Sequence, residues 1–322
     1  MNVNKILMIA AVQLVWMIPS MATGQSEESP RSIEKCYNFS KYDKECDQDL
    51  FFVITSKEAE TVSLIDPYFY CTMLESSPYK GRLNVPSYVK HNGIKWKVTG
   101  IMGFEHSSIT YAYIPSTITY MFNPFNRSGL EEVVFENNLY YITGFNECSN
   151  LKNLKLPERL DTLRNAFNDI SIQRIEVPFS TEYIEDSFSG CEYLKYLDIP
   201  TTRYISSSFC RCPLLESIKV SYTVKGISDS FNDCERLRFI ELPSREVKLE
   251  NSFNECPAIS EILVRTTEPY PFPESCFKDI DFSTCTLSVP KGCRERYRNA
   301  EGWNKFGNIA ERCSLKRPRR YF

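Results

Sequence analysis

The feature that most constrains this chain is a phenylalanine that returns at a nearly fixed interval. Successive copies are separated by 21, 20, 22, 21, 21, 22, 22 and 24 residues. A period of this length is typical of solenoids, in which each repeat is one coil of chain stacked on its neighbours. The repeat therefore excludes an ordinary globular domain between residues 101 and 290. The recurring residues are Phe104, Phe125, Phe145, Phe167, Phe188, Phe209, Phe231, Phe253 and Phe277.

Each phenylalanine opens a short motif. The motif is clearest as FNECSNLKNLKLP from Phe145, FSGCEYLKYLDIP from Phe188 and FNDCERLRFIELP from Phe231. Its end alternates apolar and polar residues, which predicts a short strand with Ile and Val or Leu directed inward. A proline after the strand ends the ladder, because proline has no N–H to donate.

One coil of this kind cannot fold alone. Six buried apolar side chains stabilise it by roughly 9–18 kcal/mol, whereas ordering about 21 residues costs roughly 20–40 kcal/mol of backbone entropy. Stacked neighbours bury the remaining apolar faces and supply ladder hydrogen bonds. We therefore predict a mainly β repeat solenoid: a right-handed superhelix of about nine coils, with one short parallel strand per coil.

Cysteine recurs at one position of the motif, which serine and isoleucine also occupy in other coils, at Ser128 and Ile170. A position shared by these residue types requires a small to medium buried side chain rather than a thiol. We therefore predict that these cysteines have no chemical role. They are Cys148, Cys191, Cys212, Cys234 and Cys256.

Asparagine after the phenylalanine and serine before it recur in the same way, for example Asn146 and Ser208. Such side chains satisfy backbone groups at turns. No G-x-S-x-G motif contains any of these serines, so we expect structural ladders rather than catalytic serines.

The N-terminus predicts export. Lys5 precedes an apolar run from Ile6 to Ile18, which a stretch of small residues follows. This layout is typical of a secretory signal peptide, here residues 1–24, and the run is too short for a spanning helix. The alternative is a buried apolar segment. We expect no transmembrane segment in the mature chain, and an exported chain permits disulfides.

The flanks of the repeat are predicted to cap it. We expect a polar, poorly ordered segment at residues 25–48 and a β-rich N-terminal cap at residues 49–100. Within the cap, Asn92-Gly93 predicts a hairpin turn. The solenoid at residues 101–290 is followed by a C-terminal cap and basic tail at residues 291–322, with one helix within Lys291–Trp303. Two candidate disulfides lie in these flanks, Cys36 with Cys46 and Cys293 with Cys313, and the sequence leaves the pairing open.

The repeat, I-x-x-x-F-x-x-C-x-x-L-x-x-I-x-L-P, resembles the BspA-like class of bacterial leucine-rich repeats from Ile101 to Pro290. A lead-in around His91–Ile101 and a closing segment with Gly302-Trp303 are also similar to that class. The family usually has alanine before the phenylalanine, whereas here only Ala166 keeps it. The resemblance implies a leucine-rich-repeat-like fold and a secreted or surface protein of a bacterium, with a role such as adhesion.

Composition narrows the function further. The net charge is −3, so the chain lacks the overall positive charge that is typical of nucleic-acid-binding proteins. With only two histidines, His91 and His106, we expect no metal site, no cofactor and no catalytic residues. The alternative hypothesis of an enzyme is a thiol-dependent hydrolase that would use Cys71.

The outward residues of the predicted strands form two columns, and a solenoid sheet is the usual recognition surface of such folds. Exposed aromatic side chains anchor partners or stack on sugar rings. The alternative is a solvated ladder of paired charges. The candidate binding residues are Tyr111, Tyr113, Arg174, Tyr196, Asp198, Lys219, Phe239 and Glu241.

These observations favour an exported, non-enzymatic protein that binds a protein or glycan on a host or bacterial surface. An alternative is a cell-envelope scaffold without a soluble ligand.

Overall fold

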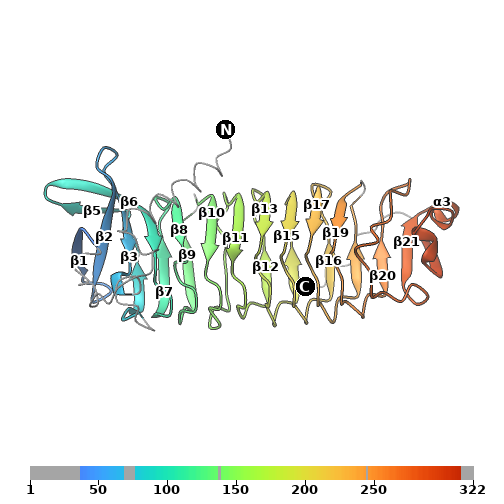
Figure 1. Ribbon diagram of the computed structural model, residues 1–322, viewed down its shortest axis with the longest axis horizontal. Coiled ribbons are helices and arrows are strands. Elements are labelled where there is room, and N and C mark those ends of the chain that lie inside the picture. The colour runs from blue at the N-terminus through green and yellow to red at the C-terminus, as the bar shows by residue number, and fades with distance from the viewer. Residues whose placement is uncertain (1–36, 69–76, 137–138, 244–245, 313–322) are drawn as a thin grey trace, which may run out of the picture.

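The computed structural model describes residues 37–68, 77–136, 139–243 and 246–312. The chain forms an elongated stack of coils with a β-rich N-terminal end and a short helix at the other end (Figure 1). The architecture is a mainly β solenoid of stacked parallel-strand coils, as the repeat predicted.

The N-terminal sheet has the strand order β1-β2-β3-β6-β5, and β8 also pairs with β6. Strand β1 lies within the segment that was predicted to be poorly ordered, and that prediction is wrong for these residues. Phe39 of β1 is buried and stacks on Phe52 with ring centroids 5.3 Å apart, so it ties the strand to the core. The strands are β1 (Phe39–Asp43), β2 (Gln48–Ser56), β3 (Thr61–Ile65), β5 (Tyr88–His91), β6 (Ile94–Met102) and β8 (Tyr120–Phe122).

The predicted hairpin is confirmed. Strands β5 and β6 pair antiparallel, with His91 opposite Ile94. Asn92 and Gly93 between them have φ values of 50° and 78°, as a two-residue hairpin turn requires.

Each regular coil carries two strands, one before its phenylalanine and one after it. The strands before it form a six-stranded sheet, here called the upstream sheet. The three-residue strands align coil by coil: Tyr183, Ile184 and Glu185 lie opposite Tyr204, Ile205 and Ser206. The strands are β10 (Tyr141–Gly144), β11 (Thr162–Ala166), β13 (Tyr183–Glu185), β15 (Tyr204–Ser206), β17 (Gly226–Ser228) and β19 (Lys248–Glu250).

The strands after the phenylalanine are the ones that the motif predicted; together with β4 before the first coil and β22 after the last, they are here called the downstream strands. They fall into three parallel sheets, β4-β7-β9, β12-β14 and β16-β18-β20-β21-β22. Their bounds are β4 (Lys80–Asn84), β7 (Ser108–Ile114), β9 (Glu132–Phe135), β12 (Arg174–Glu176), β14 (Tyr196–Asp198), β16 (Ser217–Lys219), β18 (Phe239–Glu241), β20 (Glu261–Leu263), β21 (Thr286–Pro290) and β22 (Asn308–Arg312).

The nine phenylalanines form one continuous ladder of buried rings. Neighbouring ring centroids are 5.2–5.8 Å apart. Seven of the nine have φ between 59° and 72°, a backbone conformation that costs roughly 1–3 kcal/mol per residue. Burial of each ring, roughly 1.5–3 kcal/mol, and its aromatic contacts offset that cost.

The repeated polar side chains serve the backbone. The N–H of Ser187 donates to Oγ of Ser208 at 3.0 Å, and the N–H of Ser208 donates to Oγ of Ser230 at 3.1 Å. In the neighbouring column the N–H of Asn168 donates to Oδ1 of Asn146 at 2.9 Å. These residues form structural ladders, as expected.

The C-terminal end closes the stack with aromatic side chains. Instead of the one helix predicted within Lys291–Trp303, the structure has α3 (Arg294–Arg298) and the 3-10 helix η2 (Trp303–Lys305). Gly302 between them has a φ of 79°, which interrupts the helical path. Trp303 is buried, and its Nε1 donates to the carbonyl oxygen of Tyr270 at 2.7 Å.

Candidate binding groove

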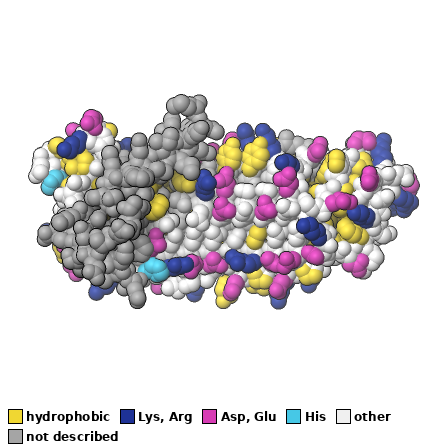
Figure 2. Space-filling view, viewed as in Figure 1, with side chains coloured by type: hydrophobic (Ala, Val, Ile, Leu, Met, Phe, Trp, Pro, Cys, Tyr) yellow, Lys and Arg dark blue, Asp and Glu magenta, His cyan; other side chains and the backbone are white. Residues whose placement is uncertain are grey.

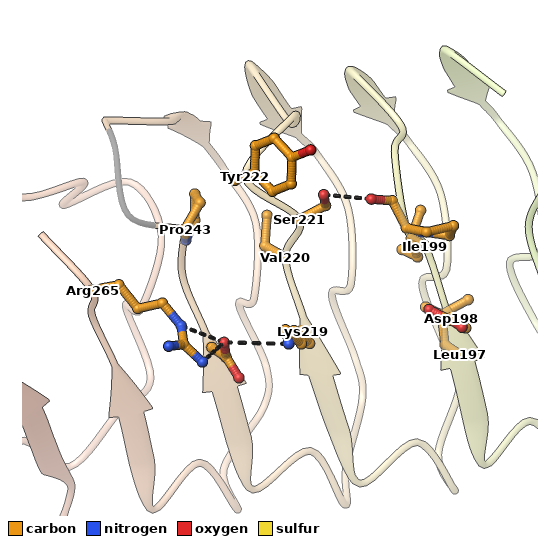
Figure 3. Close-up of a pocket in the computed structure, with 11 residues that line it drawn as sticks. Leu197, Asp198, Ile199, Lys219, Val220, Ser221, Tyr222, Pro243 and Arg265 are labelled. Carbon is orange, nitrogen blue, oxygen red and sulfur yellow. Dashed lines mark hydrogen bonds and ion pairs between the residues drawn. The ribbon is translucent and has the colours of Figure 1, made fainter. Parts of the chain in front are cut away.

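Two adjoining hollows lie on the outer side of the downstream strands. They are a hollow of about 1300 Å³ over β9 to β14 and a second hollow of about 550 Å³ over β14 to β18. Asp198 and Pro200 line both hollows. We refer to the two together as the groove; Figure 3 shows the second hollow.

Charged side chains of both signs form the floor of the groove. Arg174 and Glu176 form an ion pair of 2.7 Å on β12. Farther along, Lys219 Nζ lies 3.8 Å from Oε1 of Glu241. The floor therefore carries charges of both signs instead of presenting one field.

Exposed aromatic side chains stand at the edges of the groove. Phe179 is 79% exposed and follows β12, and Tyr222 is 70% exposed and follows β16. Tyr193 lines the other edge of the larger hollow. Large apolar side chains left this exposed at a concave surface are typical of contact sites for a partner.

Glu241 lies on the outer side of its strand, as predicted, and lines the second hollow, but it is not exposed to solvent. Its side chain is 2% exposed, because Arg265 of the next coil lies against it. The guanidinium of Arg265 pairs with Oε1 of Glu241, and Figure 3 shows both this pair and the contact with Lys219. Glu241 therefore fixes the end of the groove and is not free to pair with a partner.

The other predicted residues separate into two groups. Arg174, Asp198 and Lys219 lie in the groove with Glu241. Tyr196 is 48% exposed and stands opposite Arg174 in the strand register, but does not line the groove. Phe239 is half-buried beside Ser217.

Two predicted tyrosines near the N-terminal end are already engaged within the chain. The Arg82 guanidinium lies 3.6 Å from the ring centroid of Tyr111. The hydroxyl of Tyr113 donates to Glu136, which raises the pKa of Tyr113 to about 12. The ring of Tyr111 and the hydroxyl of Tyr113 are therefore already in contact with other residues of this chain and are less accessible to a partner.

The sequence reasoning missed Phe179, Tyr222 and Arg265. All three follow the strand, beyond the last residue of the predicted motif. The sequence does contain a signal for each of them. Phe179 directly follows Pro178 and Arg265 directly follows Val264, whereas Tyr222 follows Val220 with Ser221 between them.

The five motif cysteines are buried free thiols. Burial raises the pKa of Cys148 to about 11 and that of Cys191 to about 12, which keeps these thiols protonated and unreactive at neutral pH. Cys36, Cys71 and Cys313 lie outside the described residues, so the two candidate disulfides with Cys46 and Cys293 stay predictions. Within the described ranges, no cluster of three or more His, Cys, Asp or Glu side chains is arranged to hold a metal ion.

Structures of other leucine-rich-repeat proteins are similar to this one. A Bacteroides ovatus protein matches with a TM-score of 0.55 and 19% identity over 82% of this chain and 75% of its own. An Eubacterium ventriosum protein has a TM-score of 0.40 and 18% identity over 61% of this chain and 62% of its own. The T. pallidum leucine-rich-repeat protein has a TM-score of 0.39 and 17% identity over 65% of this chain and 87% of its own. No curated protein matches the chain.

At these identities only the first likeness supports an argument, and it supports the fold alone. None of the helices in the described ranges has the length and hydropathy needed to cross a membrane.

The model of the BspA-type leucine-rich repeat region matches residues 95–163, 121–230 and 203–299, in six copies. Together with the ladder of phenylalanines and the paired strands of each coil, this match shows that the chain belongs to the BspA-type leucine-rich-repeat family.

Proposed function

We propose that this chain is an exported bacterial surface protein that binds an extended segment of another protein in its groove, without catalysis. The observation that carries the proposal is the long groove, with charges of both signs on its floor and exposed Phe179 and Tyr222 at its edge. The signal peptide predicted at residues 1–24 supports export; these residues lie outside the described ranges.

The dimensions of the groove suit a polypeptide. It runs from β9 to Arg265, six coil steps along the axis. At roughly 4.8 Å per step this is roughly 30 Å, the length of about nine extended residues. A bound segment would place apolar side chains against Phe179 and Tyr222 and charged side chains over Arg174, Asp198 and Lys219. Aromatic anchors of this kind contribute much of the affinity of protein interfaces.

Site-specific crosslinking tests this proposal. A photoreactive phenylalanine analogue is placed at Tyr222 of the mature protein, and its crosslinks to surface proteins of host cells and of other bacteria are identified. The captured protein is then purified, and its affinity is measured for the wild type and for the variants Phe179→Ala and Tyr222→Ala. We expect each variant to weaken binding at least about tenfold, which corresponds to about 1.4 kcal/mol.

Tyr140 provides the matched control. It is an exposed aromatic residue (58%) that lies outside the groove, so the analogue at this position should capture nothing and Tyr140→Ala should bind normally. Equal capture from Tyr140 and Tyr222 would contradict the proposal. Crosslinking of Tyr222 to a glycan instead of a protein would also contradict it. Hydrolysis of the captured protein that Cys71→Ala abolishes would favour the enzyme hypothesis instead.

The remaining alternative, a cell-envelope scaffold without a soluble ligand, makes a different prediction. Such a protein would remain with the envelope fraction in high salt and show no saturable binding in the crosslinking experiment.

A further inference from the structure

A column of tyrosines runs along the outer side of the upstream sheet and ends abruptly at a glycine. In the strand register Tyr183 is followed by Tyr204, Gly226 and Lys248 in successive coils. The Tyr183 and Tyr204 rings are nearly parallel, 12° apart, with centroids separated by 5.6 Å. Figure 2 shows hydrophobic side chains gathered over β13 and β15, with Lys and Arg side chains beside them.

The glycine leaves one face of the Tyr204 ring uncovered. A Cβ at Gly226 would lie 3.5 Å from Cδ1 of Tyr204 and 3.7 Å from the carbonyl oxygen of Lys248. The other close atom is Cε1 of Tyr204, at 3.8 Å. Tyr204 is accordingly 41% exposed, whereas Tyr183, with neighbours on both sides, is half-buried.

The gap has the dimensions of one ring. Tyr204 and Lys248 are two coil steps apart, roughly 9–10 Å. A ring at the level of Gly226 would therefore stand one step from each, at the spacing that the two tyrosine rings already show. We refer to this gap as the slot.

Polar groups surround the slot. Lys248 forms an ion pair of 2.9 Å with Glu250, and Arg203 forms one of 3.2 Å with Glu182. Ser206 and Ser228 lie on the same outer side of the sheet as Tyr204, and within the described ranges neither hydroxyl takes part in a hydrogen bond. An aromatic side chain of a protein would desolvate these groups without satisfying them. A ring that carries hydroxyls would stack on the tyrosine and still offer hydrogen bonds to them.

We propose that the slot beside Tyr204 is a second binding site, separate from the groove, and that it takes one pyranose ring of a glycan. The sugar stacks its apolar face on Tyr204 at the level of Gly226. Its hydroxyls accept hydrogen bonds from Lys248 and exchange hydrogen bonds with Ser206 and Ser228. Because the charges around the slot are nearly balanced by their ion pairs, the ring is a neutral one. The proposal does not depend on the groove.

Calorimetric titration of the mature protein with cellohexaose, maltoheptaose and the hexamer of N-acetylglucosamine tests the proposal. We expect saturable binding of at least one of them below 10 mM. Tyr204→Ala removes the stacking surface and should weaken binding at least about tenfold. Gly226→Tyr fills the slot by extending the tyrosine column, and should have the same effect.

Two variants serve as controls. Gly226→Ala adds only a methyl group in ordinary contact with Tyr204, so affinity should change less than about threefold. Tyr222→Ala alters the groove and should leave glycan binding unchanged. Since Tyr204 and Gly226 are at the surface, circular dichroism of each variant should match the wild type.

Three results would overturn the proposal: no binding of any of the three sugars at 10 mM, undiminished binding in Gly226→Tyr, or loss of the protein partner rather than the sugar in Tyr204→Ala. The last result would identify the slot as part of a protein interface.

Discussion

The thiol of Cys148 donates a hydrogen bond to the carbonyl oxygen of Phe125, 23 residues earlier, at 3.0 Å. The same contact recurs from Cys191 to Phe167 at 3.5 Å and from Cys256 to Phe231 at 3.2 Å. The cysteine of each coil thus satisfies a carbonyl at the turn of the coil before it. A small buried donor at this position explains why Ser128 can stand in the same column.

The first prediction concerns the reactivity of these thiols. In the native protein at pH 8, iodoacetamide should leave Cys148, Cys191, Cys212 and Cys234 unmodified, because they are buried and their pKa values are raised. The same residues should react within minutes in denaturant. Mass spectrometry of the alkylated peptides measures both states. Rapid modification in the native state would show that the thiols are accessible, and disulfides among them would exclude the proposed role.

The second prediction is a loss of stability at alkaline pH. Between pH 9 and about 11 the thiol of Cys191 ionises in the unfolded chain but stays protonated in the folded one, whose pKa is about 12. The folded state then binds more protons than the unfolded state, so the free energy of unfolding falls as pH rises, by about 1.4 kcal/mol per pH unit for each such thiol.

Lysine and tyrosine also titrate in this range, so the comparison must be made with Cys191→Ser. Urea denaturation at pH 8, 9.5 and 10.5 should show the wild type losing more stability than the variant with each step. Parallel losses in the two proteins would contradict the assignment to Cys191.

The third prediction concerns the phenylalanine ladder. Phe209 stacks between Phe188 and Phe231 at centroid distances of 5.4 and 5.2 Å. Phe209→Ala should destabilise the protein by about 3–5 kcal/mol, because it leaves a cavity in a continuous column. Phe209→Leu keeps most of the volume and should cost about 1–1.5 kcal/mol. Denaturant titration followed by circular dichroism measures both, and equal effects would show that ring stacking and volume do not matter at this position.

The fourth prediction concerns the buried ion pair at the end of the groove. Arg265→Ala leaves the carboxylate of Glu241 buried with only Lys219 nearby, and should cost about 3 kcal/mol. The double variant Glu241→Leu with Arg265→Leu should recover most of that loss, because no unpaired charge remains. If the double variant is less stable than Arg265→Ala, the pair itself stabilises the fold.

The motif residues determined most of the fold. The fixed spacing of phenylalanine, cysteine and the alternating Ile and Leu residues predicted stacked coils with parallel strands, because each coil repeats the same inward side chains. The upstream sheet was not predicted as strands. Four of its six strands are only three residues long, as in Tyr204–Ser206, and a single inward Ile205 gives no alternation to recognise.

The candidate site was predicted only in part, because its character depends on contacts between coils. Arg174, Asp198 and Lys219 could be placed on the outer side of a strand from their position in the motif. The burial of Glu241 could not, since it results from Arg265 reaching back from the next coil. Likewise, the open face of Tyr204 depends on a glycine 22 residues later.

The sequence by itself thus determined what repeats: the coil length, the buried ladders and the membership of a solenoid family. These follow from local periodicity, which a linear chain displays directly. The tertiary structure alone decided where the repeat is broken to form the groove and the slot, because each depends on side chains that stacking brings within contact from different coils.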